Sequence, residues 1–350
     1  MTPIPEVSVV VPTLNRPALV ARAVRSALAQ TVPNIEVLVV VDGPDPATRA
    51  ALDSFADHRL RVIGLPARGG APSARNAGVR AARAPWTALL DDDDEWLPTK
   101  LAVQLDLARR ATAPLPIVGS RLINRTPRAE FVIPRRLPAS GESLSEYLTV
   151  RRGLFHGDGF IQTSTILAPT RLLRRVPFDP AVPRMQELDW TLRALAHDDV
   201  ELLIADQPLV IWHQDEDRPR ISLHSPWQRQ LEWLRRSRPL FTPRAYAAVT
   251  MSVISSMAAG TRSPKVFGTL WREAHRHGRP GPLDYLTFLQ IWLIPPTLRH
   301  RLRDLALTRP STGTAGSPPD AGARPDRESP PDNGSPASSG AAPAGAQPGQ

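Results

Sequence analysis

The chain has 350 residues, of which 41% are hydrophobic, so it can bury a core in one large domain or in two smaller ones. It contains no cysteine, which excludes disulfide bonds and thiolate metal sites. The formal net charge of +9 suits a phosphate-bearing substrate, an anionic membrane face or nucleic acid. We expect no nucleic-acid partner, because neither a basic stripe interleaved with aromatic residues nor a recognition motif accompanies the charge. The N-terminus lacks the basic segment of a secretory signal, so we expect a cytoplasmic protein.

Strand and helix patterns alternate along the first part of the chain. Apolar and β-branched runs predict buried strands at residues 7–11, 35–41, 60–65 and 85–90. Apolar residues at helical spacing predict helices over residues 19–28 and 73–79. Pro17 suits the first turn of the earlier helix, and Thr13 or Asn15 can cap it. This order predicts an α/β fold in which helices flank a doubly wound sheet.

Polar residues follow the ends of these strands. Thr13 follows the first strand, Asp42 follows the second, and Arg75 lies on the helix that precedes an acidic run. In doubly wound sheets, ligands bind at the carboxyl ends of the strands, so this convergence predicts a nucleotide site. Residues 12–16 contain no glycine, which excludes the dinucleotide fingerprint after the first strand, and no P-loop motif is present.

The acidic run, residues 91–95, has the sequence DDDDE and gives the strongest chemical signal in the chain. Consecutive carboxylates repel one another, and burying one without a partner is costly. A hard divalent cation, Mg²⁺ or Mn²⁺, would relieve the repulsion. Because alternate residues of an extended segment point the same way, we expect Asp91 and Asp93 to share the ion. The alternative is an acidic first turn on the next helix, which the helix dipole would favour.

The later part of the chain divides by composition. Residues 116–222 have a looser pattern, residues 223–310 have a helical pattern, and residues 311–350 are rich in Pro, Gly, Ala and Ser. The last region has no apolar run whose burial could offset the entropy cost of ordering it, so we expect a disordered tail. The apolar stretch 283–298 is shorter than the ~20 residues that a membrane-spanning helix needs.

This apolar stretch has three interpretations. It can pack internally, or it can lie on the inner face of a membrane as a peripheral contact, where the basic residues around Arg301 would meet anionic headgroups. Contact between two copies of the chain is the third.

Six segments occur in a specific order and spacing: residues 9–16 (VVVPTLNR), 29–31 (AQT), 40–43 (VVDG), 74–78 (ARNAG), 90–98 (LDDDDEWLP) and 186–190 (QELDW). Together they resemble the inverting glycosyltransferases of family 2. The resemblance implies a GT-A fold, which is a Rossmann-like mixed sheet flanked by helices. It also implies that residues 1–115 bind the nucleotide sugar and that residues 116–222 supply the acceptor site and the catalytic base.

The resemblance implies roles for individual residues. Pro12, Thr13 and Asn15 would line the nucleotide pocket. Arg75 would approach the phosphates, or else lie on a solvated helix face. Asp42 would accept a hydrogen bond from the base, or else serve as a turn residue before Gly43. Asp91 and Asp93 would form the D-x-D pair that holds Mn²⁺ or Mg²⁺, and Asp92 would contact the ribose or the sugar. Val41 departs from the commonest pattern, which has a second Asp here, so the match does not fix the nucleobase.

Family members place an acidic base at the start of a helix in the second half, and Glu187 occupies the matching position. Most members have Asp there, so Asp189 is the second candidate, and the helix dipole alone could favour both acids. His213 would add a metal ligand or act as an ordinary hydrogen-bonding residue. Gln162 and Ser164 would line the acceptor pocket or pack in a polar loop.

These features predict a metal-dependent inverting transferase of polysaccharide or cell-envelope biosynthesis. Its donor would be a nucleoside diphosphate sugar, with a UDP-sugar as the first choice, and its acceptor a hydroxyl of a glycan, a lipid-linked saccharide or a small molecule. Two alternatives differ in class. A non-catalytic carbohydrate-binding protein would have no need of the acidic residues, and a sugar nucleotidyltransferase would need a Gly-rich first loop with a lysine, which this chain lacks.

Overall fold

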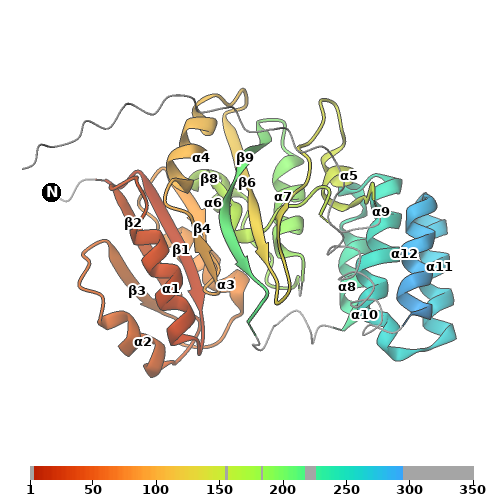
Figure 1. Cartoon of the computed structure of the whole chain (residues 1–350), viewed down its shortest axis with the longest axis horizontal. Coiled ribbons are helices and arrows are strands. Elements are labelled where there is room, and N and C mark those ends of the chain that lie inside the picture. The colour runs from red at the N-terminus through yellow and green to blue at the C-terminus, as the bar shows by residue number, and fades with distance from the viewer. Residues whose placement is uncertain (1–3, 154–156, 183, 217–225, 295–350) are drawn as a thin grey trace, which may run out of the picture. The chain divides into compact units, whose positions relative to one another are not determined.

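The computed structural model describes residues 4–153, 157–182, 184–216 and 226–294 (Figure 1). The tail predicted to be disordered, residues 311–350, lies outside the described residues, as does the end of the helical region after residue 294.

The described residues form one mixed sheet of nine strands, in the order β3-β2-β1-β4-β8-β6-β9-β5, with β7 paired to β6. The strands are β1 (Val7–Thr13), β2 (Ile35–Val41), β3 (Leu60–Gly64), β4 (Trp86–Leu89), β5 (Asp94–Trp96), β6 (Leu115–Arg125), β7 (Glu130–Ile133), β8 (Leu167–Pro169) and β9 (Val200–His213). Strands β1 to β4 pair in parallel, whereas β8 is antiparallel to β4 and β5 is antiparallel to β9. The predicted α/β fold with a mixed sheet is confirmed.

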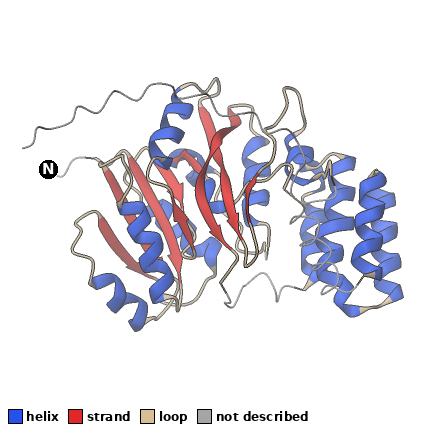
Figure 2. Ribbon diagram, in the orientation of Figure 1, coloured by secondary structure: helices blue, strands red, loops and turns tan. Residues whose placement is uncertain are grey.

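Helices lie on both faces of the sheet (Figure 2). In the sheet domain they are α1 (Pro17–Leu28), α2 (Pro46–Asp53), α3 (Ala71–Ala81), α4 (Lys100–Arg109), α5 (Leu144–Thr149), α6 (Thr170–Arg175) and α7 (Gln186–Leu195), with a 3-10 turn η1 (Thr163–Thr165). Helix α2 was not predicted from the sequence. It begins at Pro46, and the Asp45 side chain caps it by accepting a hydrogen bond from the Thr48 N–H at 3.0 Å.

The two faces of the central strands pack against different helices, as alternation along a strand requires. Val9, Val11, Val37 and Val39 share a core with Val20 and Val24 of α1. Val10, Leu38 and Val40 share a second core with Ala74 and Val79 of α3. Because both faces are covered, β1 and β2 are apolar over most of their length. The exceptions are Thr13 at the carboxyl end of β1 and the pair Ser8 and Glu36 near the amino ends, where Ser8 Oγ donates to Glu36 Oε1 at 2.6 Å.

The later described residues are helical, as predicted. They form α8 (Trp227–Arg236), η3 (Arg238–Leu240), α9 (Pro243–Val249), the π-helix η4 (Thr250–Ile254), α10 (Ser255–Ala258), η5 (Ala259–Thr261), α11 (Pro264–His277) and α12 (Pro282–Leu293). Leu188 and Leu192 of α7 belong to the core of these helices, so α7 packs against both the sheet and the helical region. Among the described residues, no helix is both long enough and apolar enough to cross a membrane.

We predict that Gly78→Ala destabilises the protein. Gly78 lies in α3, and a Cβ atom there would be 2.4 Å from Val10 Cγ1 and 3.2 Å from Val40 Cγ2. The overlap should lower the free energy of unfolding by about 1–3 kcal/mol, although alanine favours helices over glycine by about 1 kcal/mol. The measurement is urea unfolding. Gly268→Ala in α11 is the control, because its Cβ would meet no atom within 4 Å, and it should be neutral or stabilising.

Candidate functional site

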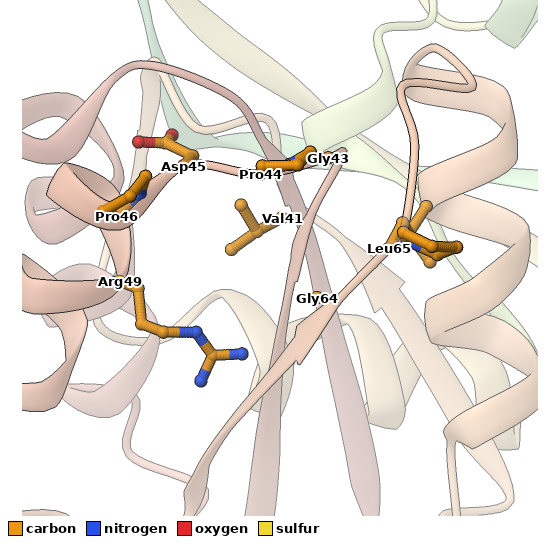
Figure 3. A pocket seen from close by; sticks show the side chains of 9 residues that line it. Val41, Gly43, Pro44, Asp45, Pro46, Arg49, Gly64 and Leu65 are labelled. Carbon is orange, nitrogen blue, oxygen red and sulfur yellow. The ribbon is translucent and has the colours of Figure 1, made fainter.

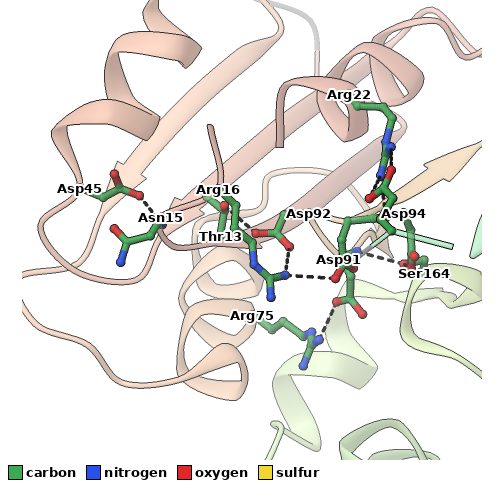
Figure 4. A network of polar contacts seen from close by, with 12 residues as sticks. Thr13, Asn15, Arg16, Arg22, Asp45, Arg75, Asp91, Asp92, Asp94 and Ser164 are labelled. Carbon is green, nitrogen blue, oxygen red and sulfur yellow. Dashed lines mark hydrogen bonds and ion pairs between the residues drawn. The ribbon is translucent and has the colours of Figure 1, made fainter. Parts of the chain in front are cut away.

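The acidic run lies at the carboxyl end of β4 and continues into β5 (Figure 4). It does not form the first turn of a helix, because α4 begins at Lys100 and no acidic residue lies in its first turn. The run is also not fully extended. The Asp94 N–H donates to the Asp91 carbonyl at 3.1 Å, so residues 91–94 form a turn. Exposure nevertheless alternates, since the side chains of Asp91 and Asp93 are 23% and 20% exposed while Asp92 and Asp94 are buried.

Arginines contact the carboxylates of the run. Arg16 Nη1 lies 2.9 Å from Asp92 Oδ1 and 3.1 Å from Asp93 Oδ2. Arg75 Nη2 lies 2.6 Å from Asp91 Oδ1, and Arg22 Nη2 donates to the Asp93 carbonyl at 3.1 Å. The guanidinium groups therefore relieve part of the repulsion that a divalent cation was expected to relieve. Neither Arg16 nor Arg22 was predicted to take part. Arg16 could have been found, because it follows the end of β1 by three residues and so lies at the same sheet edge, but nothing in the sequence distinguishes Arg22 from other helical arginines.

Two carboxyl groups of the run, those of Asp92 and Asp94, are buried and have raised pKa values. Burial and the neighbouring Asp93 raise the pKa of Asp92 to about 6, against the opposing effects of Arg16 and Thr13. Burial raises the pKa of Asp94 well above its usual range, and Asp93 and Asp91 add to the increase. Protons at these positions are therefore retained at a higher pH than on a free Asp.

Gln162 and Ser164 form hydrogen bonds with the acidic run. Asp94 Oδ2 accepts hydrogen bonds from Ser164 Oγ at 2.6 Å and from Gln162 Nε2 at 2.7 Å. Ser164 Oγ also accepts from the Asp91 N–H at 3.0 Å. Of the two interpretations of these residues, packing in a polar segment is the one that the structure displays. The same contacts show that Asp94, to which the sequence analysis gave no role, anchors the run.

The predicted nucleotide-binding residues lie at one sheet edge but have different partners. Thr13 Oγ1 donates to Asp92 Oδ2 at 2.7 Å, so the end of β1 is joined to the acidic run. Thr13 and Asn15 do not cap α1, because its N-cap residue is Arg16 and no side chain caps it. Asn15 has a φ of 56°, and its N–H donates to Asp45 Oδ2 at 2.5 Å.

The remaining two nucleotide residues are buried. Asp42 accepts hydrogen bonds from the Gly69 and Gly70 N–H groups, each at 2.8 Å, and so holds the loop that leads into α3. Pro12 lies within β1 and is buried. Each carboxylate oxygen of Asp42 thus already accepts a backbone hydrogen bond, and a nucleobase would have to donate to a remaining lone pair.

A cavity of about 420 Å³ lies beside this edge, at the ends of β2 and β3 (Figure 3). Its lining residues are Val41, Gly43, Pro44, Asp45, Pro46, Arg49, Gly64, Leu65 and Pro66. None of the predicted nucleotide-binding residues is among them. Val41, which departs from the family pattern, is one of the apolar residues of this wall.

Helix α7 places Glu187 near the acidic run. Arg75 bridges the two, because its Nη1 donates to Gln186 Oε1 at 2.8 Å while its Nη2 contacts Asp91. Burial is the main cause that raises the pKa of Glu187, and Asp91 acts in the same direction, while Arg75 and Arg184 oppose it. A partly buried carboxylate with a raised pKa suits proton transfer near neutral pH.

Asp189, the second candidate for the base, has a different environment. It is 3% exposed, its Oδ1 accepts from Trp233 Nε1 at 2.8 Å, and its Oδ2 accepts from Arg193 Nε at 2.8 Å. The first contact joins α7 to α8, and the second lies within α7, so both oxygens are used. The two acids lie on one helix turn but have different environments. Glu187 is near the acidic run, whereas Asp189 is buried between α7 and α8.

The three predicted metal ligands are not brought together. His213 lies at the end of β9, with Nε2 3.3 Å from Glu95 Oε2 and Nδ1 3.5 Å from Asp215 Oδ1. Within the described ranges, no three His, Asp or Glu side chains are grouped closely enough to hold a metal ion. Asp91 and Asp93 instead have different arginine partners, so a shared ion would require these ion pairs to rearrange.

Comparison with known proteins gives a family model and several relatives. The model described as "Glycosyl transferase family 2" matches residues 8–164. Succinoglycan biosynthesis protein ExoO of Rhizobium meliloti is 40% identical over 114 residues, which are 33% of this chain and 33% of that protein. UDP-Glc:alpha-D-GlcNAc-diphosphoundecaprenol beta-1,3-glucosyltransferase WfgD of Escherichia coli is 29% identical over 132 residues, which are 37% of this chain and 52% of that protein. The chain thus spans about a third of the first of these relatives and about half of the second.

Among solved structures, S. aureus TarS 1–349 in complex with UDP is 16% identical, with 85% of this chain and 92% of that chain covered and a TM-score of 0.47. The mannosyltransferase PcManGT from Pyrobaculum calidifontis, in complex with GDP-Man and Mn²⁺, is 18% identical, with 90% and 77% covered and a TM-score of 0.45.

We predict that Asp189→Asn lowers the free energy of unfolding by about 1–3 kcal/mol, because it weakens a buried hydrogen bond to Trp233 and a partly buried one to the Arg193 cation. Glu187→Gln is the matched control on the same helix turn and should change the free energy of unfolding by less than about 1 kcal/mol. Denaturant unfolding of both variants provides the measurement. If Asp189→Asn were as stable as the wild type, the structural role of Asp189 would be wrong.

Proposed function

Residues 8–164 belong to glycosyl transferase family 2, and from this premise we propose that the chain transfers a sugar from a nucleoside diphosphate to an acceptor hydroxyl with inversion at the anomeric carbon. The observation that supports this most strongly is the bridge made by Arg75. It joins Asp91, in the acidic run at the end of β4, to Gln186, the residue before Glu187. This bridge supports the proposal because it would hold a group for the phosphates and a group for the acceptor proton near each other.

We propose that the nucleoside contacts Pro12, Thr13, Asn15 and Asp42, with Asp92 at the ribose or sugar. Thr13 and Asp92 are already hydrogen-bonded to each other, so the end of β1 and the acidic run form one wall. Arg16 and Arg75 would exchange carboxylate partners for the diphosphate oxygens, since guanidinium groups bind both kinds of anion in a fork geometry. WfgD has UDP-Glc and a diphosphoundecaprenol-linked acceptor in its name, which supports a UDP-sugar donor and a lipid-linked saccharide acceptor here.

The acidic run also suits a divalent cation. Its carboxylate oxygens are hard ligands of the kind that Mg²⁺ and Mn²⁺ prefer. Asp91 and Asp93 are the two partly exposed aspartates of the run, and Asp91 Oδ2 has only a long contact of 3.4 Å, with Gln162 Nε2, among the hydrogen bonds that the structure describes. We therefore propose Asp91 and Asp93 as the ligands, while His213 keeps its contact with Glu95. A bound cation would stabilise the charge of the departing diphosphate.

Glu187 is our proposed general base. Its carboxylate would accept the proton of the acceptor hydroxyl while that oxygen forms a bond to the anomeric carbon. The bond from the anomeric carbon to the phosphate oxygen breaks, and the electron pair leaves with the nucleoside diphosphate. Because the attacking and leaving oxygens lie on opposite sides of the carbon, the configuration inverts. A raised pKa makes Glu187 a stronger base once it has ionised.

We predict that nucleotide binding depends on a divalent cation and on Asp93. Asp93→Ala should abolish the increase in UDP affinity that Mn²⁺ produces, and Asp91→Ala should reduce it, because each removes a ligand. Isothermal titration with UDP, with and without Mn²⁺, measures this. Asp198→Ala, which removes an exposed carboxylate elsewhere, should behave as the wild type. UDP binding that is insensitive to a chelator in the wild type would contradict the proposed metal site.

For Glu187→Gln we predict that sugar transfer at saturating donor falls by ~10² or more, while UDP and Mn²⁺ still bind, because the base acts on the acceptor alone. Glu187 must be ionised to act as the base, and its pKa is raised. The wild-type rate should therefore increase with pH, with a midpoint above the pKa of an ordinary Glu. The variant should lack this increase. A near-normal transfer rate in Glu187→Gln would show that the base lies elsewhere.

A further inference from the structure

Helix α12 is apolar on the face that it does not bury. Thr287, Phe288 and Ile291 face the core of the helical region. On the opposite side, Leu286 and Leu289 are each 41% exposed and Leu293 is 73% exposed. These three leucines are spaced i, i+3 and i+7, so they form one ridge along the helix. Gln290 is the exposed polar residue beside this ridge on the described part of α12. An exposed apolar ridge of this length is typical of a surface that meets a partner or lipid.

Aromatic rings fill the contact between α11 and α12, which lie side by side in Figure 1. The Phe267 and Trp292 ring centroids are 5.5 Å apart, and those of Trp271 and Tyr285 are also 5.5 Å apart. Trp271, Tyr285 and Trp292 are only partly buried. Partly buried Trp and Tyr rings next to an apolar ridge are typical of surfaces that meet the boundary between water and lipid.

Helix α11 contributes a basic ridge. Lys265, Arg272 and Arg276 are exposed and are spaced i, i+7 and i+11, which places them on one face, opposite the buried residues Leu270 and Ala274. No carboxylate is exposed on the described residues of α11 or α12. Their two acids are both buried and paired, Glu273 with Arg235 and Asp284 with Arg244. The surface of the two helices is therefore apolar along one ridge and purely cationic along the other.

We propose that this surface docks onto an anionic lipid bilayer. The leucine ridge of α12 would insert below the headgroups, the aromatic rings would lie at their level, and the basic ridge of α11 would contact lipid phosphates. A second copy of the chain fits the surface less well, because a two-fold contact would bring two unpaired basic ridges together. This inference is independent of the transfer chemistry, although it would place the enzyme where a lipid-linked acceptor is found.

The experiment is flotation of the full-length chain with vesicles of phosphatidylglycerol and phosphatidylcholine in equal parts. The wild type should bind these vesicles, bind more weakly at high salt, and not bind phosphatidylcholine alone. Leu286→Gln/Leu289→Gln/Leu293→Gln should weaken binding at least ~10-fold. Lys265→Gln/Arg272→Gln/Arg276→Gln should weaken it about 10²-fold, at about fivefold per charge removed.

Two matched controls separate this surface from general properties of the chain. Arg80→Gln/Arg109→Gln/Arg171→Gln removes the same charge from exposed positions elsewhere, and Ile4→Gln/Val132→Gln removes exposed apolar side chains elsewhere. Both should bind as the wild type does. The proposal is overturned if the wild type does not float with the anionic vesicles, or if the leucine variant floats equally well. Light scattering tests the alternative of a second copy. If the wild type is a dimer and the leucine variant is a monomer that no longer binds vesicles, a second copy covers the surface and the proposal is also wrong.

Discussion

The compensation of three adjacent carboxylates, those of Asp91, Asp92 and Asp93, by arginines is the constraint on which the site depends. Arg16 and Arg75 come from different elements, the start of α1 and the middle of α3, and each is drawn to the end of β4 by charge. Arg75 also reaches α7 through Gln186, so neutralising the acidic run positions the helix that carries Glu187. The same arginines suit phosphate, which means that the contacts holding the site together can be exchanged for contacts to a diphosphate.

Burial gives chemically similar acids different roles. Asp91 and Asp93 remain partly exposed, whereas Asp94 is fully buried and anchors the turn through Ser164 and Gln162. Glu187 and Asp189 differ in the same way, since Asp189 is hydrogen-bonded to Trp233 and Arg193 while burial and Asp91 raise the pKa of Glu187. A raised pKa is useful only in the residue that must take up a proton. The partition of roles therefore follows from environment and not from residue type.

Much of this fold could be predicted from the sequence, because strands buried on both faces leave continuous apolar runs such as residues 35–41. The position of the acidic run at a strand end could be predicted for the same reason. Its turn could not, because the hydrogen bond from the Asp94 N–H to the Asp91 carbonyl leaves no composition signal. The roles of Asp94 and Asp189 were missed because their partners, Ser164 and Trp233, are distant in sequence. Arg16 could have been found from its place after β1, whereas Arg22 was missed because long-range ion pairs cannot be assigned among so many arginines.

We propose that a cation and a nucleoside diphosphate replace the arginine contacts of the acidic run together. A cation alone would have to displace Arg16 and Arg75 with no new partner for either, whereas the diphosphate supplies that partner. The most direct test is calorimetric titration of Mn²⁺ into the wild type with and without saturating UDP. Mn²⁺ should bind at least ~10-fold more tightly with UDP present, and UDP should bind more tightly with Mn²⁺ present by the same factor. Equal Mn²⁺ affinities in the two titrations would contradict it.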